Sequence, residues 1–184
     1  MSVEVVPQEF TYVQFDAGRI EHAMTELLER IGLGDRDVRV EVDETSPIAR
    51  VQVQPGDPIL VTAESGAFED ARRPRELSEL AVVTAAGRML LRLGDRERSE
   101  FGDAPSDDAL TLAQSAAWDV VSISRLEGVG YAVNRQRWLY NFRNRHGFTD
   151  IGDRVFEELW SDGAASWSVL AAQSDQALAA RIPA

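Results

Sequence analysis

The sequence predicts an α+β fold, with a small antiparallel or mixed sheet in the N-terminal half and a helical C-terminal half. Three observations lead to this prediction. Short runs of alternating apolar and polar residues occur between residues 10 and 63, one long apolar helix follows them, and only helical spacing occurs after residue 106. A chain of 184 residues is long enough for one core. We therefore expect one domain, with a sheet-plus-helix part over about 1–94 and a helical part over about 106–184.

The first predicted elements are a strand, a helix and a group of three strands. Phe10–Phe15 alternates large and small side chains, as a short strand does. Asp16 can then cap a helix over Arg19–Ile31, in which apolar residues recur at helical spacing. Three strand-like segments follow at residues 38–42, 48–53 and 59–61. Because proline-containing turns separate them, we expect a meander with one covered face.

Helices account for the rest of the expected structure. A charged loop over 72–74 leads into Glu76–Leu93, whose wide apolar surface predicts a core helix. An exposed, charged connection over 95–106 leads to a long helical pattern that Ser106 and Asp107 can cap. Three further helices are predicted. The first covers 131–145, the second is capped by Asp150 and ends at Gly163, and the third covers Ala164–Arg181.

The composition excludes several classes of site. All 19 basic residues are arginine, cysteine is absent, and the two histidines are His22 and His146. Without lysine there is no Schiff-base chemistry and no phosphate-loop lysine. Without cysteine there is no disulfide, no thiol nucleophile and no thiolate metal site. We therefore expect no metal and no cofactor.

Charge and hydropathy indicate the compartment and the partners. The net charge is −12, and residues 1–70 alone carry 15 acidic residues against 5 arginines. Such a body repels phosphate backbones and favours basic partners. No apolar run approaches the ~20 residues of a membrane span, and the first ten residues lack the pattern of a secretory signal. We expect a cytoplasmic bacterial protein with no membrane partner, and we attribute the exclusive use of arginine to a GC-rich genome.

One stretch of the chain resembles a known family. The order helix, three strands and helix, with Ile59–Phe68 before Glu76–Leu93, resembles the edge strand and active-site helix of the minimal zincin-like metallopeptidases. That family carries His-Glu-x-x-His on the helix, often with glycine before the second histidine. If Gly87 takes the glycine position, the motif falls on Thr84-Ala85-Ala86-Gly87-Arg88. Neither zinc ligand nor the general base is then present, so the resemblance implies an inactive relative that kept the scaffold.

Arg88 lies in the middle of the most apolar predicted helix and has two interpretations. Its guanidinium either reaches the surface or pairs with a carboxylate such as Glu64. Alternatively, Arg88, Thr84 and Glu64 form a pocket for a small anionic ligand, in the place where the family holds its metal. The second interpretation predicts a ligand-binding protein or a metal-independent enzyme.

Residues 134–146 form the only basic block of the chain, with four arginines, three interleaved aromatic residues and no acidic residue. The candidate interaction residues in it are Arg135, Arg137, Trp138, Arg143, Arg145 and His146. Arginines among aromatic residues are typical of single-stranded nucleic-acid binding, but a helix with one core side and one solvated side gives the same pattern. Because the protein as a whole is acidic, we favour a protein partner or a second copy over nucleic acid.

These observations lead to one functional hypothesis and two alternatives. The hypothesis is a non-catalytic protein, a metal-free zincin-like scaffold, that acts through protein contacts or self-association. The first alternative is the anion-binding pocket around Arg88. The second is nucleic-acid binding through residues 134–146.

Overall fold

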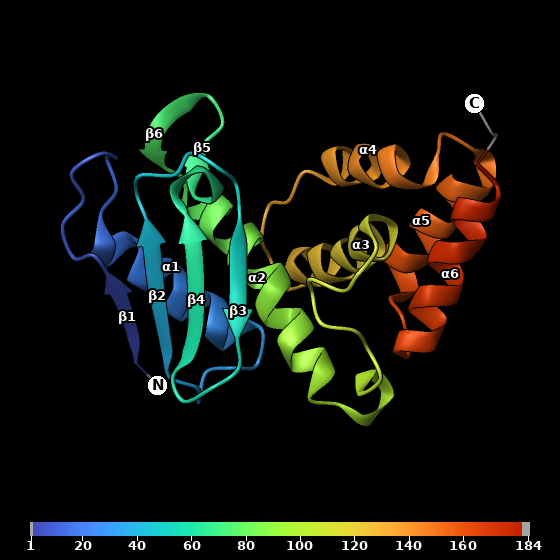
Figure 1. Cartoon of the computed structure of the whole chain (residues 1–184), viewed down its shortest axis with the longest axis horizontal. Coiled ribbons are helices and arrows are strands. Elements are labelled where there is room, and N and C mark those ends of the chain that lie inside the picture. Colours follow the sequence, from blue (N-terminus) through green and yellow to red (C-terminus); the bar gives the residue numbers. More distant parts are fainter. Residues whose placement is uncertain (1, 182–184) are drawn as a thin grey trace. The chain divides into compact units, whose positions relative to one another are not determined.

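The computed structural model describes residues 2–181 and confirms the α+β class. Helices and strands follow one another along the chain as shown in Figure 1. The chain divides into two compact units, Met1–Leu93 and Gly94–Ala184. Unit 1 contains the sheets, and unit 2 is helical.

Unit 1 is built on a four-stranded mixed sheet. Its elements are β1 (Val3–Val6), α1 (Ala17–Arg30), β2 (Val38–Asp43), β3 (Val51–Gln54) and β4 (Ile59–Glu64). The strand order is β1-β2-β4-β3. β1, β2 and β4 are parallel, and β3 forms an antiparallel hairpin with β4 at the edge of the sheet. Because α1 connects β1 to β2, these three elements form a βαβ unit.

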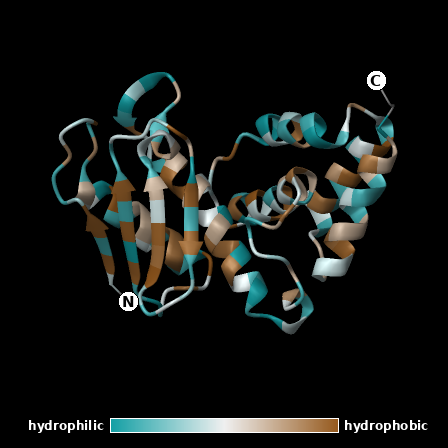
Figure 2. Cartoon of the chain, viewed as in Figure 1, coloured by the Kyte–Doolittle hydropathy of each residue, from teal (hydrophilic) through white to brown (hydrophobic). Residues whose placement is uncertain are grey.

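The two faces of this sheet differ in polarity. Along β2 and β4 the apolar residues alternate with polar or partly exposed ones, so one face carries buried side chains such as Val40 and Val61. α1 covers this face, as Figure 1 shows, and the side chain of its N-cap residue Asp16 accepts a hydrogen bond from the backbone N–H of Arg19 at 2.8 Å. The opposite, open face carries residues such as Glu41 and Thr62. Figure 2 shows the alternation as bands of teal and brown along the strands.

Three expectations about the sheet are wrong. Phe10–Phe15 is not a strand: only Gln14 makes an isolated bridge, to Glu76, and the rings of Phe10 and Phe15 meet edge to face at 5.5 Å. The first strand is instead β1, which the sequence analysis missed. The meander is also wrong, because only β3 and β4 form a hairpin. Finally, Ile59–Glu64 is not an edge strand, since it lies between β2 and β3.

The segment after β4 was only partly predicted. Of the expected charged loop at 72–74, Arg72 lies in a turn and the other two residues begin β6 (Arg73–Leu77), which pairs with the short β5 (Glu69–Asp70). α2 therefore begins later than predicted, at Glu79, and it continues to Arg96. Between β4 and β5 a single 3-10 turn, η1 (Ser65–Ala67), packs against the backbone of Pro47.

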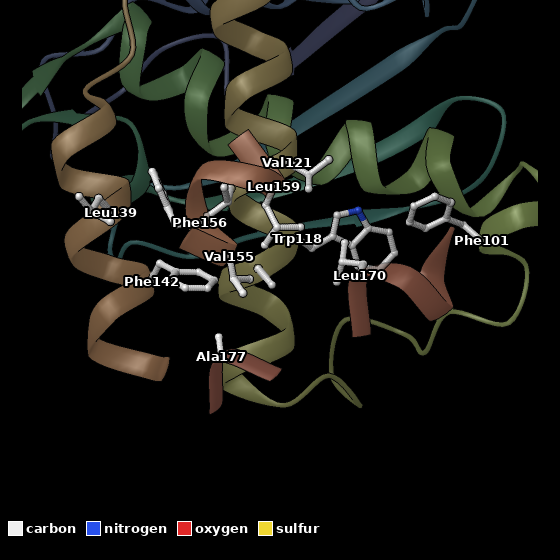
Figure 3. Packing of buried hydrophobic residues seen from close by; sticks show 12 residues of the cluster. Phe101, Trp118, Val121, Leu139, Phe142, Val155, Phe156, Leu159, Leu170 and Ala177 are labelled. Atoms are coloured by element: carbon white, nitrogen blue, oxygen red, sulfur yellow. The ribbon is translucent and has the colours of Figure 1, made fainter. Parts of the chain in front are cut away.

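Over its described residues, unit 2 contains the end of α2, from Gly94, and four further helices around one apolar core. They are α3 (Leu112–Gly128), α4 (Arg135–His146), α5 (Asp150–Asp162) and α6 (Trp167–Ala179), preceded by the 3-10 turn η2 (Ser99–Phe101). Trp118 of α3 lies in the core and is fully buried. Figure 3 shows it near side chains from the turn and from the other helices, among them Phe101, Leu159 and Leu170.

Local capping decides where each helix of unit 2 begins. α3 begins after Thr111, whose side chain and backbone exchange hydrogen bonds with Gln114 as a capping box, and not at Ser106 and Asp107 as expected. α5 is capped by Thr149, one residue before the predicted cap at Asp150. The expected exposed connection over 95–106 is also partly wrong, because it contains a fully buried aromatic ring, that of Phe101.

Candidate interaction surface on α4

α4 holds the basic block of the chain and is fixed in unit 2 along one side. The Asn134 side chain caps it by accepting a hydrogen bond from the backbone N–H of Arg137 at 3.1 Å. The helix ends before Gly147, which has a φ of 98° that favours glycine. Leu139, Phe142 and His146 are buried, while most of the helix is teal in Figure 2. One side of α4 therefore belongs to the core, and the other side is polar.

Two of the predicted interaction residues hold α4 against α5. Arg135 forms an ion pair with Glu157, and its guanidinium lies 5.3 Å from the ring centres of Phe156 and Trp160. Arg143 binds Asp153 with two hydrogen bonds, of 2.7 and 2.6 Å. These bonds raise the pKa of Arg143 and lower the pKa of Asp153. Both arginines therefore already have carboxylate partners within unit 2.

His146 is a core residue, so its prediction as part of an interaction surface is wrong. Its side chain is fully buried, and its ring stacks on Phe142 with 3.9 Å between ring centres. Nδ1 lies 3.1 Å from the carbonyl oxygen of Phe142, and Nε2 lies 2.9 Å from Oγ of Ser174. Burial lowers the pKa of His146, which favours the neutral ring. Trp138 is also partly buried and packs against the core of unit 2.

The remaining two arginines lie on the exposed side of α4. Arg137 and Arg145 are exposed, and within the part of the chain that the structure describes neither has a carboxylate oxygen within 4.0 Å. Beside them are two aromatic residues that the sequence analysis did not select, Tyr140 (60% exposed) and Phe148 (63% exposed). Their rings meet edge to face at 6.0 Å. We call the set Arg137, Tyr140, Asn144, Arg145 and Phe148 the α4 face.

Helical spacing could have identified the α4 face. Arg137, Tyr140 and Asn144 follow one another at intervals of three and four residues, which places them on one side of a helix. Sequence reasoning selected the arginines by charge and therefore included Arg135, which faces α5. The position of Phe148 depends on the turn at Gly147, so helical spacing alone does not place it.

Two residues of the predicted anion pocket, Thr84 and Glu64, use their side chains in separate local contacts. The Thr84 hydroxyl donates to the carbonyl oxygen of Leu80 at 2.8 Å, one turn earlier in the same helix. Glu64 alternates with Ala63 along β4 and lies on the open face of the sheet. There it accepts a hydrogen bond from Ser46 and forms an ion pair with Arg50 at 3.2 Å. Arg88, like Thr84, belongs to α2.

A hollow of about 520 Å³ lies at the end of the open face of the sheet in unit 1. Three carboxylates line it, those of Glu41, Asp43 and Glu64, together with the guanidinium of Arg50. The other lining residues are Val6, Pro7, Val42, Gln52, Thr62 and Ala63. We call this feature the carboxylate hollow. A second hollow, of about 330 Å³, is lined by Tyr12, Glu44 and Arg75 among others.

Three further observations concern partners and relatives. Over residues 2–181 no helix is both long enough and apolar enough to cross a membrane. In the same range no three histidine, aspartate or glutamate side chains converge as they would around a metal ion. No protein-family model, no curated protein and no solved structure matches this chain.

Proposed function

We propose that this protein is a non-catalytic cytosolic protein that acts through protein contacts and associates with further copies of itself through the α4 face. The observation that carries the proposal is that the four arginines of α4 have two different environments. Arg135 and Arg143 are bound to carboxylates of α5, whereas Arg137 and Arg145 are exposed beside two exposed aromatic rings.

The composition of the α4 face supports a protein partner. Arginine and tyrosine are among the residues that most often dominate the binding energy of protein interfaces, and phenylalanine is also enriched there. Tyr140 and Phe148 are more than half exposed, although aromatic side chains of this size gain free energy when they are removed from water. Because the rings already contact each other, they lose little side-chain freedom when a partner covers them.

The charges of the α4 face and of the whole chain favour an acidic partner surface. The α4 face carries two positive charges and no acidic residue, while the whole chain has a net charge of −12. A second copy therefore offers acidic surface in excess, and the net repulsion between copies is screened beyond about 8 Å at physiological salt. We propose self-association as the first function to test.

The zincin-like resemblance remains a proposal about the origin of unit 1. It is supported by the order of a mixed sheet and a following apolar helix, α2. Thr84 and Arg88 stand at the two zinc-ligand positions of the aligned motif, and neither is a zinc ligand of the type the chemistry requires. We propose that unit 1 now serves as a scaffold and as an interaction surface.

Nucleic-acid binding is the alternative that one observation favours, namely exposed arginines beside exposed rings. It is weakened by the ion pairs of Arg135 and Arg143, which leave two of the four arginines of the block for phosphates. An anionic ligand at Arg88 remains a second alternative, and no described hollow includes Arg88.

The test compares the wild type with two variants by sedimentation velocity over a wide range of protein concentration. The variant Arg137→Glu/Arg145→Glu reverses the charge of the α4 face from +2 to −2. The control variant Arg19→Glu/Arg72→Glu makes the same change of charge at exposed positions of unit 1. We expect the wild type and the control to associate as concentration rises and the α4 variant to remain monomeric.

Two results would overturn the proposal. One is a wild type that is monomeric throughout the concentration range, and the other is an α4 variant that associates like the control. In parallel, fluorescence anisotropy of a labelled single-stranded oligonucleotide at about 50 and about 200 mM salt tests the alternative. Salt-sensitive binding that the α4 variant loses would establish nucleic acid as the ligand of this face instead.

A further inference from the structure

We infer that the α4 face of one copy docks into the carboxylate hollow of the next copy, so that copies join head to tail. This inference rests on the proposed function and names the surface that receives the α4 face. Both surfaces belong to the same chain, one on unit 2 and one on unit 1. We take the occupant to be a second copy, because the two surfaces are complementary in charge and chemistry.

The carboxylates of the hollow are held in place by neighbouring groups. Arg39 binds Glu41 through Nε at 2.8 Å, and Arg50 binds Glu64 at 3.2 Å. The Thr45 hydroxyl and backbone N–H bind Asp43 at 2.6 and 2.9 Å and lower its pKa. A carboxylate offers about four acceptor positions, so each can accept a further donor without losing its present partner. The hollow thus presents three fixed carboxylates, two of which are already paired with an arginine, and Arg50 is the cation that lines it.

The hollow also has an apolar part. Val6, Pro7 and Ala63 line it beside the carboxylates, and its volume of about 520 Å³ lies within the range of pockets that hold a bound group. A purely ionic site would suit a small cation. A site that combines apolar atoms with carboxylates suits aromatic rings flanked by guanidinium groups.

The α4 face has this combination. The edge-to-face pair of Tyr140 and Phe148 provides the apolar part, and Arg137 and Arg145 provide donors that bind carboxylates with two parallel hydrogen bonds. Docking would remove the two rings from water and would place the arginines opposite Glu41 and Asp43 or Glu64. Docking of the hollow against another acidic surface is disfavoured, because the two surfaces would repel each other.

Because the two surfaces differ, this contact is heterologous. A heterologous contact leaves one α4 face and one hollow unfilled in a dimer, so association continues until a ring closes or a filament grows. A two-fold symmetric contact would instead stop at the dimer. The stoichiometry of association therefore distinguishes docking in the hollow from symmetric pairing of two α4 faces.

The experiment uses two full-length variants, each with one surface blocked. The first is Arg137→Glu/Arg145→Glu, which blocks the α4 face. The second is Glu41→Arg/Gln52→Arg, which reverses charge in the hollow, removes one carboxylate partner of Arg39, and leaves Asp43 and Glu64 in place. A control, Glu21→Arg/Glu29→Gln, makes the same change of net charge at exposed positions of α1. Circular dichroism and sedimentation velocity are recorded for each protein and for mixtures.

We expect each blocked variant to associate at least roughly tenfold more weakly than the wild type, whereas the control associates normally. An equimolar mixture of the two blocked variants keeps one intact α4 face and one intact hollow. It should therefore form a complex of two chains and stop there, whereas the wild type forms larger species. This chain-terminated dimer is the result that supports the inference.

The other outcomes separate the two proposals. If the α4 variant is monomeric and the hollow variant associates like the wild type, the hollow is not the receiving surface, and the proposed function stands without this inference. If both blocked variants associate normally, or the wild type is monomeric, both proposals fail. If the doubly substituted hollow variant does not fold, Gln52→Arg alone, at an exposed position of β3, replaces it in the same mixing experiment.

Discussion

The indole Nε1–H of Trp118 donates a hydrogen bond of 3.0 Å to Oδ2 of Asp95 inside unit 2. Asp95 is only 2% exposed, and its other carboxylate oxygen accepts a hydrogen bond of 2.8 Å from Arg125. The Trp118 ring lies 5.6 Å from Phe101 and 5.4 Å from Trp167, between ring centres. One carboxylate thus fixes the orientation of the largest side chain in the core of unit 2.

Replacement of Asp95 should destabilise unit 2. Asp95→Ala leaves the indole N–H without its acceptor and removes the partner of Arg125, so we expect the free energy of unfolding to fall by about 3 kcal/mol. All four tryptophans lie in unit 2, so urea unfolding followed by tryptophan fluorescence measures this change. The control is Arg98→Ala. Its guanidinium lies 3.7 Å from Asp95 and is half exposed, so its loss should cost less than about 1 kcal/mol. Equal losses in the two variants would contradict the role assigned to Asp95.

The buried ring of His146 should make unit 2 sensitive to pH. Burial lowers the pKa of His146 in the folded state below its ordinary value of 6.5, so the unfolded chain binds a proton first as pH falls. The free energy of unfolding should therefore be highest above pH 6.5 and should decline as pH falls from there toward the folded-state pKa. Urea titrations at several pH values measure the slope. His146→Phe should flatten it. A slope that persists in His146→Phe would show that another group titrates.

Position 66 in unit 1 requires glycine, because another backbone segment passes too close to leave room for a side chain. A Cβ added there would lie 2.0 Å from the carbonyl oxygen of Pro47, far inside contact distance. We expect Gly66→Ala to lower the free energy of unfolding by about 1–3 kcal/mol. The control is Gly94→Ala within α2, where an added Cβ meets no atom within 4 Å and helix propensity favours alanine by up to about 1 kcal/mol. Thermal melts and hydrogen exchange of β4 provide the readout, and a stable Gly66→Ala protein would contradict the expected clash.

A pH titration of the Asp153 carboxylate should detect its ion pair with Arg143. The two hydrogen bonds from Arg143 hold the pKa of Asp153 below its ordinary value of 3.8. The stability that this pair contributes is therefore present above pH 3.8 and is lost as pH falls through the lower folded-state value. In Arg143→Gln the pKa of Asp153, measured by NMR, should rise toward 3.8. Arg154→Gln, beside Glu158 on the same helix, should leave the pKa of Asp153 unchanged.

Sequence reasoning located most elements of regular structure because their signals are local. The periodic apolar residues of α1 and the cap at Asp16 were both predicted, and the structure confirms them. Errors occurred where several residues could cap the same helix. Thr111 and Gln114 cap each other, and this reciprocal pair determines the start of α3 more strongly than the polar cluster at Ser106 and Asp107.

The candidate site was predicted in part for a similar reason. The position of the basic block on a helix and the exposed arginines Arg137 and Arg145 agree with the sequence. The burial of His146 and the ion pairs of Arg135 and Arg143 do not follow from their own segment, because their partners lie in α5 and α6. Charge counted along a sequence does not show which charges are already paired across helices.

By itself, the sequence determined the fold class, the covered and open faces of the strands, and the absence of lysine and cysteine chemistry. These properties depend on composition and on the two periods of regular structure, which neighbouring residues specify. Only the tertiary structure decided the strand order, the interior place of β4 and the pairing of Glu64 with Arg50. It also decided which arginines remain for a partner. These properties depend on contacts between residues far apart in the chain, which a local pattern does not encode.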